Sequence, residues 1–212
     1  MPYSRPDELP PEKTLVDQFE RAIKSLVRRF RNHPFCFYTE TDMHCYLYHQ
    51  LYKKPFNELY KTSEGFDTIL LHKEFPTNAK YRRQNDQTLK TDPNSKRRGR
   101  FDIAIWDPEY VSSRRHRKQQ VLCAAELALN ECGPKNIHTI NDSTKLADPK
   151  NEIRYSYLLY FVRNEGIKQY EKNKKRIRQQ LEDAAKRVNV AFALVDGTSK
   201  PKPLYLGRWQ TA

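Results

Sequence analysis

The sequence lacks the features of membrane and secreted proteins. No stretch approaches the roughly 20 consecutive apolar residues that a membrane-spanning helix needs. The first residues, Met1 to Glu8, contain no apolar signal core. We therefore expect a cytoplasmic protein that has no membrane partner.

Several short motifs of well-known enzyme classes are also missing. The chain contains no G-x-x-x-x-G-K-[ST], G-x-G-x-x-G, H-E-x-x-H or G-x-S-x-G pattern. These absences argue against a P-loop nucleotide hydrolase, a dinucleotide-binding enzyme, a zincin protease and a serine hydrolase of the nucleophile-elbow type.

Paired cysteines are absent as well. Cysteines stand at positions 36, 45, 123 and 132 without a C-x-x-C pair, so we expect reduced thiols and no zinc knuckle. A zinc site that gathers Cys36, Cys45 and some of the histidines at 33, 44 and 49 stays open as an alternative.

Positive charge is abundant. The 39 Lys and Arg residues against 26 Asp and Glu residues give a net charge of +13, which attracts polyanions. Nucleic acid is the expected partner, and a charged surface kept for solubility is the alternative.

The 212 residues favour one domain. Residues 1–12 carry four prolines and predict a flexible arm, so the domain is expected to span residues 13–212. Apolar periodicity predicts helices over 13–31, 39–53 and 168–188, the second capped by Thr39. Short apolar runs predict strands over 68–76, 100–106, 121–129, 157–162, 190–195 and 204–206, with polar surface loops over 77–99 and 107–120.

Two acidic residues lie inside predicted strands. Alternation places Asp102 and Ala104 on one face of the strand over 100–106, and it places Glu126 and Ala128 on one face of the strand over 121–129. If the strands pair, the two carboxylates lie close together and need a compensating cation. Oxygen ligands of this kind suit Mg²⁺, which supports phosphodiester hydrolysis. Taken alone, two such acids are more often structural.

The order of the elements resembles a known family. A helix that begins near Glu40 is followed by a strand, a strand with Gly99-Arg-Phe-Asp102, a strand with Glu126, a helix and a strand. This order is similar to the core of the PD-(D/E)XK nucleases over about residues 36–162. The resemblance implies an α/β fold of restriction-endonuclease-like type, in which a mixed central β-sheet is flanked by helices.

The resemblance also implies roles for particular residues. Asp102 and Glu126 would bind Mg²⁺, or Mn²⁺ in its place, and the Leu127 carbonyl would coordinate the same ion. Glu40 would assist from the helix. The expected activity is metal-dependent endonucleolytic cleavage of DNA, and cutting of both strands would favour a homodimer.

The family pattern places a lysine two residues after the glutamate, where this sequence has Ala128. Loss of that ammonium should impair hydrolysis more than binding. Another cation could replace it, with Lys145 the foremost candidate and Arg100 the second; otherwise the protein has lost catalysis, or the alanine is an engineered substitution.

Basic clusters precede both acidic strands. They predict salt-sensitive contacts with phosphates, although each could equally be a solvated loop. The residues expected to bind nucleic acid are Arg82, Arg83, Lys96, Arg97, Arg98, Arg100, Arg114, Arg115, Arg117 and Lys118.

Three functions follow from these observations. The first is a DNA nuclease that uses Glu40, Asp102, Glu126 and Lys145. The second is a non-catalytic nucleic-acid-binding or assembly module with a degenerate nuclease fold. The third is a protein-interaction domain, which would bind duplex DNA weakly even at low salt. Glu40 and His44 are one helical turn apart, but no third ligand is near them in sequence, so this spacing alone does not predict a metal site.

Overall fold

The structure is a computed structural model and describes residues 10–61, 67–107, 120–133, 137–197 and 199–209. The helices are α1 (Glu12–Asn32), α2 (Glu40–Leu51), α4 (Ile137–Ala147) and α5 (Asn164–Ala185), with 3₁₀ turns η1 (Pro34–Cys36) and η2 (Pro149–Asn151). The strands are β1 (Tyr60–Lys61), β2 (Asp67–Thr68), β3 (Leu71–Arg83), β4 (Leu89–Thr91), β5 (Arg98–Trp106), β6 (Val121–Leu129), β7 (Ile153–Arg163), β8 (Asn189–Val195) and β9 (Leu204–Leu206).

A mixed sheet of seven strands forms the middle layer, in the order β4-β3-β5-β6-β7-β8-β9. The pairs β4-β3, β3-β5, β5-β6 and β8-β9 are antiparallel, whereas β6-β7 and β7-β8 are parallel. Each parallel pair is joined through a helix, α4 or α5, as parallel strands require. The predicted α/β class with a mixed central sheet is confirmed.

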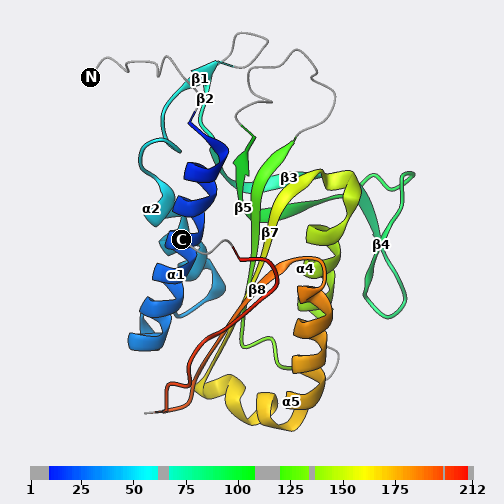
Figure 1. Cartoon of the computed structure of the whole chain (residues 1–212). Coiled ribbons are helices and arrows are strands. Elements are labelled where there is room, and N and C mark those ends of the chain that lie inside the picture. The colour runs from blue at the N-terminus through cyan, green and yellow to red at the C-terminus, as the bar shows by residue number, and fades with distance from the viewer. Residues whose placement is uncertain (1–9, 62–66, 108–119, 134–136, 198, 210–212) are drawn as a thin grey trace.

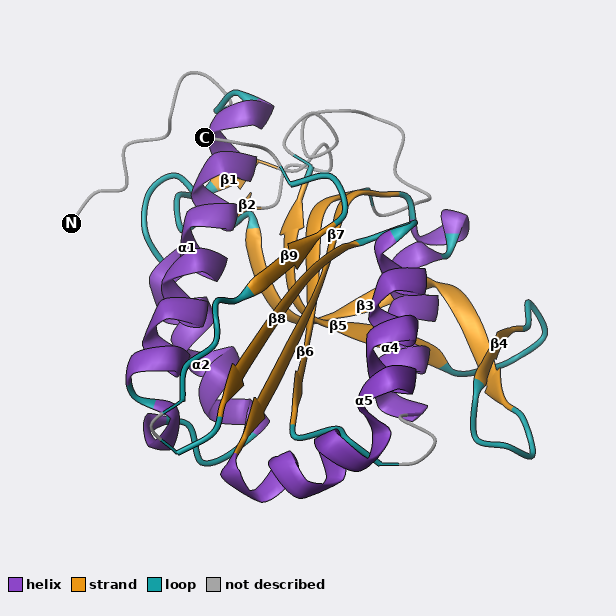
Figure 2. Cartoon of the chain, turned by 60° about the horizontal axis from the view of Figure 1, so that its bottom comes forward, coloured by secondary structure: helices purple, strands orange, loops and turns teal. Residues whose placement is uncertain are grey.

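Helices cover both faces of the sheet (Figures 1 and 2). The apolar stripe of α1 and that of α2 pack against one face with side chains such as Phe19 and Leu47. Helices α4 and α5 cover the other face with side chains such as Leu146 and Leu181. Because β6 lies between these two layers, almost all of its residues are buried, which explains its nearly continuous apolar sequence.

The helices follow their predicted ranges closely. Helix α1 begins at Glu12, one residue before the predicted start, and the Glu12 carboxylate pairs with Arg154 and accepts a hydrogen bond from Tyr155. Glu12 therefore belongs to the folded part of the chain, while residues 1–9 of the predicted arm lie outside the described residues. Among the described helices, no apolar stretch has the length needed to traverse a bilayer.

The prediction of a surface loop over residues 77–99 is wrong. Strand β3 continues to Arg83 and pairs with β4, and β5 already begins at Arg98. This part of the sheet extends beyond the helices (Figure 1). Burial still alternates along β3, where Thr77, Ala79 and Tyr81 are buried. Only Ala79 and Tyr81 of these are apolar, so this stretch lacks the apolar run that predicts a strand. The other predicted loop, over 107–120, lies mostly outside the described residues.

Candidate active site

The two strands that carry the predicted acids separate at those acids. Strands β5 and β6 pair over Ile103–Trp106, and the ladder ends where Ile103 faces Ala125. The same register places Asp102 opposite Glu126. Here the Leu127 N–H donates to Oδ2 of Asp102 over 2.8 Å. This hydrogen bond to a side chain takes the place of a backbone hydrogen bond between the two strands. Beyond this point β5 leads toward β4 while β6 continues beside β7 (Figure 2).

Lys145 reaches this opening from α4. Its Nζ lies 2.7 Å from Oε1 of Glu126 and 3.0 Å from Oδ1 of Asp142. It also donates to the Arg100 carbonyl over 3.1 Å. The ammonium therefore connects the acid on β6 with the backbone of β5, across the gap between the strands.

Neither the motif position, Ala128, nor the second candidate, Arg100, brings a positive charge to Glu126. Ala128 is buried in the apolar cluster beneath α4 and α5. The Arg100 guanidinium is 69 % exposed and lies 3.8 Å from Oε2 of Glu74. Of the two candidate replacements, Lys145 is the one that contacts Glu126.

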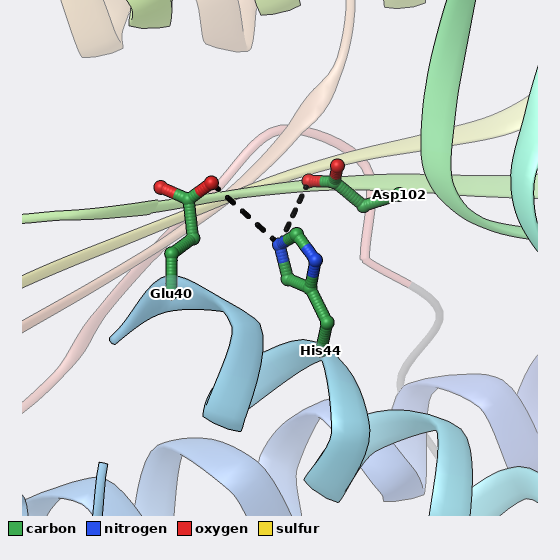
Figure 3. Close-up of side chains that lie close together, drawn as sticks. All are labelled: Glu40, His44 and Asp102. Atoms are coloured by element: carbon green, nitrogen blue, oxygen red, sulfur yellow. Dashed lines mark ion pairs between the residues drawn. The ribbon is translucent and has the colours of Figure 1, made fainter. Parts of the chain in front are cut away.

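Helix α2 contributes two further side chains (Figure 3). Nε2 of His44 lies 3.3 Å from Oδ2 of Asp102 and 3.7 Å from Oε1 of Glu40. One ligand atom from each of these three residues lies within 4.8 Å of the other two. The three side chains therefore form a group that could hold a metal ion.

The expectation that Glu40 and His44 would lack a third ligand is wrong, because Asp102 supplies it. His44 was missed as a site residue. The signal in the sequence was its four-residue spacing from Glu40, but the completing ligand is 58 positions farther along the chain than His44. Only the packing of α2 beside β5 and β6 brings them together.

A capping box fixes the start of α2 and therefore the direction of Glu40. The Thr39 hydroxyl accepts a hydrogen bond from the Asp42 N–H, and the Asp42 carboxylate accepts one from the Thr39 N–H over 2.7 Å. The cap predicted at Thr39 is confirmed. Its box satisfies two backbone donors at the helix start.

The three potential ligands affect one another's charge. Burial and the nearby Asp102 carboxylate raise the pKa of Glu40 to about 7. Burial disfavours the imidazolium of His44, but Asp102 and Glu40 outweigh it and raise the pKa of that ring. Burial likewise opposes ionisation of Asp102, yet His44 and the Leu127 N–H hold its pKa below the ordinary value.

Around Glu126, too, the carboxyl groups outnumber the positive charges. Burial and the neighbouring Asp142 raise the pKa of Glu126 well above its ordinary value. Burial raises the pKa of Asp142 too. For Lys145, the two carboxylates outweigh burial and raise the pKa of the ammonium, so Lys145 stays protonated near neutral pH.

The side chains become more exposed from the inside outward. The exposed fraction is 2 % for Glu126, 13 % for Lys145, 16 % for Asp102 and 41 % for Glu40. A ligand would therefore meet Glu40 and Asp102 first. The basic side chains paired with the acids here are two, Lys145 and His44, whereas the carboxyl groups are four: Glu40, Asp102, Glu126 and Asp142. A divalent cation would offset this excess of negative charge.

The donor set fits such an ion. Carboxylate oxygens suit Mg²⁺ and Mn²⁺, whereas an imidazole nitrogen such as that of His44 suits transition metals. The predicted metal residues Asp102, Glu126 and Leu127 are neighbours here. Of these, Asp102 belongs to the three-residue group, while Glu126 is paired with Lys145.

Of the predicted nucleic-acid-binding residues that the structure describes, most lie on one projection. Residues 80–98, which we call the basic arm, comprise the outer part of β3, β4 and the turn into β5 and stand out from the body (Figures 1 and 2). Arg82, Arg83, Lys96, Arg97 and Arg98 are exposed on the arm, and Arg100 is exposed beside it. Arg114, Arg115, Arg117 and Lys118 lie outside the described residues.

The basic arm is attached to the helix that carries Lys145. Oδ1 of Asn141, on α4, accepts from the Leu89 N–H over 2.8 Å, and its amide donates to the Gln87 carbonyl. Thr91 donates to Asp148, just after α4, over 2.6 Å. The arm and the candidate site therefore share one rigid support.

The alternative zinc site finds no support among the described residues. Cys36 and Cys45 are exposed free thiols, and His44 faces Asp102 and Glu40. Comparison of the chain with family models, with curated proteins and with solved structures gave no match.

Proposed function

We propose that this protein is a metal-dependent nuclease that hydrolyses phosphodiester bonds of DNA, with a PD-(D/E)XK-like site in which Lys145 takes the place of the missing strand lysine. The observation that carries the proposal is the 2.7 Å contact between Nζ of Lys145 and Oε1 of Glu126. It supplies an ammonium at the acidic pair although Ala128 stands at the motif position.

The order of the elements supports the same proposal. Helix α2 with Glu40, strand β3, strand β5 with Asp102, strand β6 with Glu126, helix α4 and strand β7 follow one another along the chain. The four strands are successive neighbours in the sheet. Their sequence order is the one on which the resemblance to these nucleases rests.

Each group then has a chemical task. Glu40, His44 and Asp102 would hold a divalent ion: their carboxylates suit Mg²⁺ and Mn²⁺, and the imidazole of His44 favours Mn²⁺ of the two. Such an ion lowers the pKa of a bound water and offsets negative charge on a phosphate. Lys145, which stays protonated, can donate a hydrogen bond to an oxygen on which charge develops. Glu126 and Asp142 hold that ammonium in place.

The basic arm would bind the sugar-phosphate backbone. Residues 80–98 contain seven Lys and Arg residues against two Asp residues, a balance that favours salt-dependent binding of phosphates. Because the arm is joined to α4, a strand bound to it would lie at a fixed position relative to Lys145.

A second function is favoured by one observation. Glu126 is only 2 % exposed, and Lys145, its partner, is 13 % exposed. A closed ion pair of this kind could serve stability alone, in a nucleic-acid-binding module that retains the fold without catalysis.

Cleavage of supercoiled and linear DNA in Mg²⁺ or Mn²⁺ distinguishes the two functions. We expect the chain to cut, and we expect Asp102→Asn and Lys145→Ala to cut at least about 100-fold more slowly. Lys186→Ala is the matched control, because Lys186 is 71 % exposed and pairs with Asp183 at the end of α5. Circular dichroism confirms that each variant is folded.

Two outcomes would contradict the nuclease proposal. If folded Asp102→Asn cuts as fast as the parent chain, the cleavage does not arise at this site. If no variant cuts, including Ala128→Lys, while DNA still binds, the protein is a binding module. Cleavage by Ala128→Lys alone would mean that Lys145 does not replace the strand lysine.

A further inference from the structure

Exposed aromatic rings gather just before α2. Among the described residues, the large apolar side chains with substantial exposure are Phe35 at 60 %, Tyr38 at 83 %, Tyr52 at 53 % and Leu204 at 43 %. Phe35 and Tyr38 lie three positions apart in the same turn. Single exposed apolar residues are common in proteins, so the support beneath this turn decides whether the pair is significant.

The turn is held by a buried arginine. Arg163, at the end of β7, is 3 % exposed, and it donates to the Pro34 carbonyl over 2.5 Å and to the Tyr38 carbonyl over 3.1 Å. Its guanidinium also lies 5.6 Å from the centre of the Phe35 ring. From the other side, the Tyr38 N–H donates to Oδ2 of Asp42 over 2.8 Å. The backbone is therefore fixed while the ring of Tyr38 remains in solvent.

The position of Tyr38 places it at the candidate site. It precedes Glu40 by two residues, so their Cα atoms are at most about 7.6 Å apart. Glu40 is the first residue of α2 and faces His44 and Asp102 (Figure 3). The backbone that carries the exposed ring is thus close to the backbone of Glu40, the outermost residue of the candidate metal group.

We propose that Tyr38, supported by Phe35, stacks against an unpaired nucleobase next to the phosphate bound at this site. An aromatic ring stacks on the face of any base, but in a duplex those faces are covered by neighbouring bases. The net charge of +13 and the basic arm would hold the backbone of the same strand. The preferred substrate class is therefore a single strand, or a duplex with an unpaired end. This inference rests on the proposed function for the position of the strand.

Binding in EDTA tests the inference without cleavage. The probes are a single-stranded oligonucleotide that contains 2-aminopurine and the matching duplex, each titrated with the full chain at two salt concentrations. We expect Tyr38→Ala to weaken single-strand binding by about 5-fold or more and to abolish the fluorescence quenching that stacking causes. Duplex binding should stay within about 2-fold, because it depends on phosphate contacts.

Two variants serve as controls. Tyr38→Phe keeps the ring and should behave as the parent chain. Tyr52→Ala removes another exposed ring, at the far end of α2, where it stacks on Tyr48 with ring centres 5.6 Å apart, and it should bind both probes normally. Tyr38→Ala keeps the backbone hydrogen bonds to Asp42 and Arg163 and should therefore fold.

The outcomes separate this inference from the proposed function. If Tyr38→Ala binds the single strand as well as the parent does, or weakens both probes equally, the stacking role is overturned even when Asp102 and Lys145 prove necessary for cleavage. If the chain never cleaves but loses single-strand binding and quenching in Tyr38→Ala alone, the stacking role is supported and the nuclease proposal fails.

Discussion

Two glutamates, one on either face of the central sheet, are each only 2 % exposed, yet their surroundings differ. Glu20 lies on α1, and its Oε1 accepts a hydrogen bond from the Tyr157 hydroxyl over 3.0 Å. Glu126 lies on β6, and its Oε1 is 2.7 Å from the Lys145 ammonium. Tyr157 offers Glu20 a neutral hydroxyl, since burial raises the pKa of Tyr157, whereas Lys145 offers Glu126 a positive charge.

Burial alone therefore does not distinguish a functional carboxylate from a structural one. Glu20 adds an acid to the apolar layer beneath α1 and α2. Burial raises the pKa of Glu126, and the nearby carboxyl groups of Asp142 and Asp102 raise it further. The second arrangement has an excess of negative charge near Asp102, which is partly exposed. A divalent cation could offset this excess and could then attract a phosphate.

Removal of each partner should show the difference in stability. Lys145→Met leaves Glu126 and Asp142 buried without a cation, so we expect unfolding in urea at pH 7 to become easier by about 3–5 kcal/mol. Tyr157→Phe removes one hydrogen bond whose donor is a neutral hydroxyl and should cost about 1–3 kcal/mol.

The pH dependence of this loss follows from the buried carboxyls. In Lys145→Met the folded-state pKa of Glu126 lies above its unfolded value, because burial raises it, so the penalty is present above the folded-state pKa and falls as the pH drops through it. Equal losses for Lys145→Met and Tyr157→Phe at every pH would contradict the distinction between the two glutamates.

Metal binding should sharpen the comparison further. An ion that binds only the folded chain, added at about 100 times its Kd, stabilises it by about 2.7 kcal/mol. We expect Mn²⁺ or Mg²⁺ to raise the melting temperature of the parent and of Glu20→Gln, because Glu20 is not one of the three residues of the candidate metal group and accepts a hydrogen bond from Tyr157 instead. Asp102→Asn should lose this shift. A shift that survives in Asp102→Asn but not in Glu20→Gln would place the ion away from the group of Glu40, His44 and Asp102.

Periodicity and strand alternation predicted much of the framework. The apolar stripe of α1, the cap at Thr39 and the range of β6 follow from residues close together in the sequence. The closeness of Asp102 and Glu126 was predicted on the condition that their strands pair, and the structure meets that condition. Lys145 could be named in advance because the missing lysine at Ala128 directed attention to nearby cations.

Features that depend on tertiary packing could not be predicted. The strands of the basic arm are mostly polar, with Tyr81 buried on β3, so no run of apolar residues marks them in the sequence. The contact of His44 with Asp102 joins residues 58 positions apart, and the proposed role of Tyr38 depends on the Arg163 beneath its turn. Nor could a pattern tell that Glu20, within a charged helix, is buried, because its Tyr157 partner lies 137 positions along the chain.

The smallest effect we predict concerns the space beside Lys145. A Cβ added at Gly99 would lie 3.0 Å from Cδ of Lys145 and 3.3 Å from Cγ2 of Thr77, so the lysine stem must shift by a few tenths of an ångström. Gly99→Ala should therefore slow cleavage by about 2- to 10-fold through misplacement of the ammonium, with little change in melting temperature. Gly133→Ala is the matched control, because among the described residues, its chain neighbours aside, no atom lies within 4 Å of its added Cβ. If the two variants cleave at the same rate, the exact position of Lys145 does not limit the reaction, and its contact with Glu126 would resemble that of Tyr157 with Glu20, a stabilising contact only.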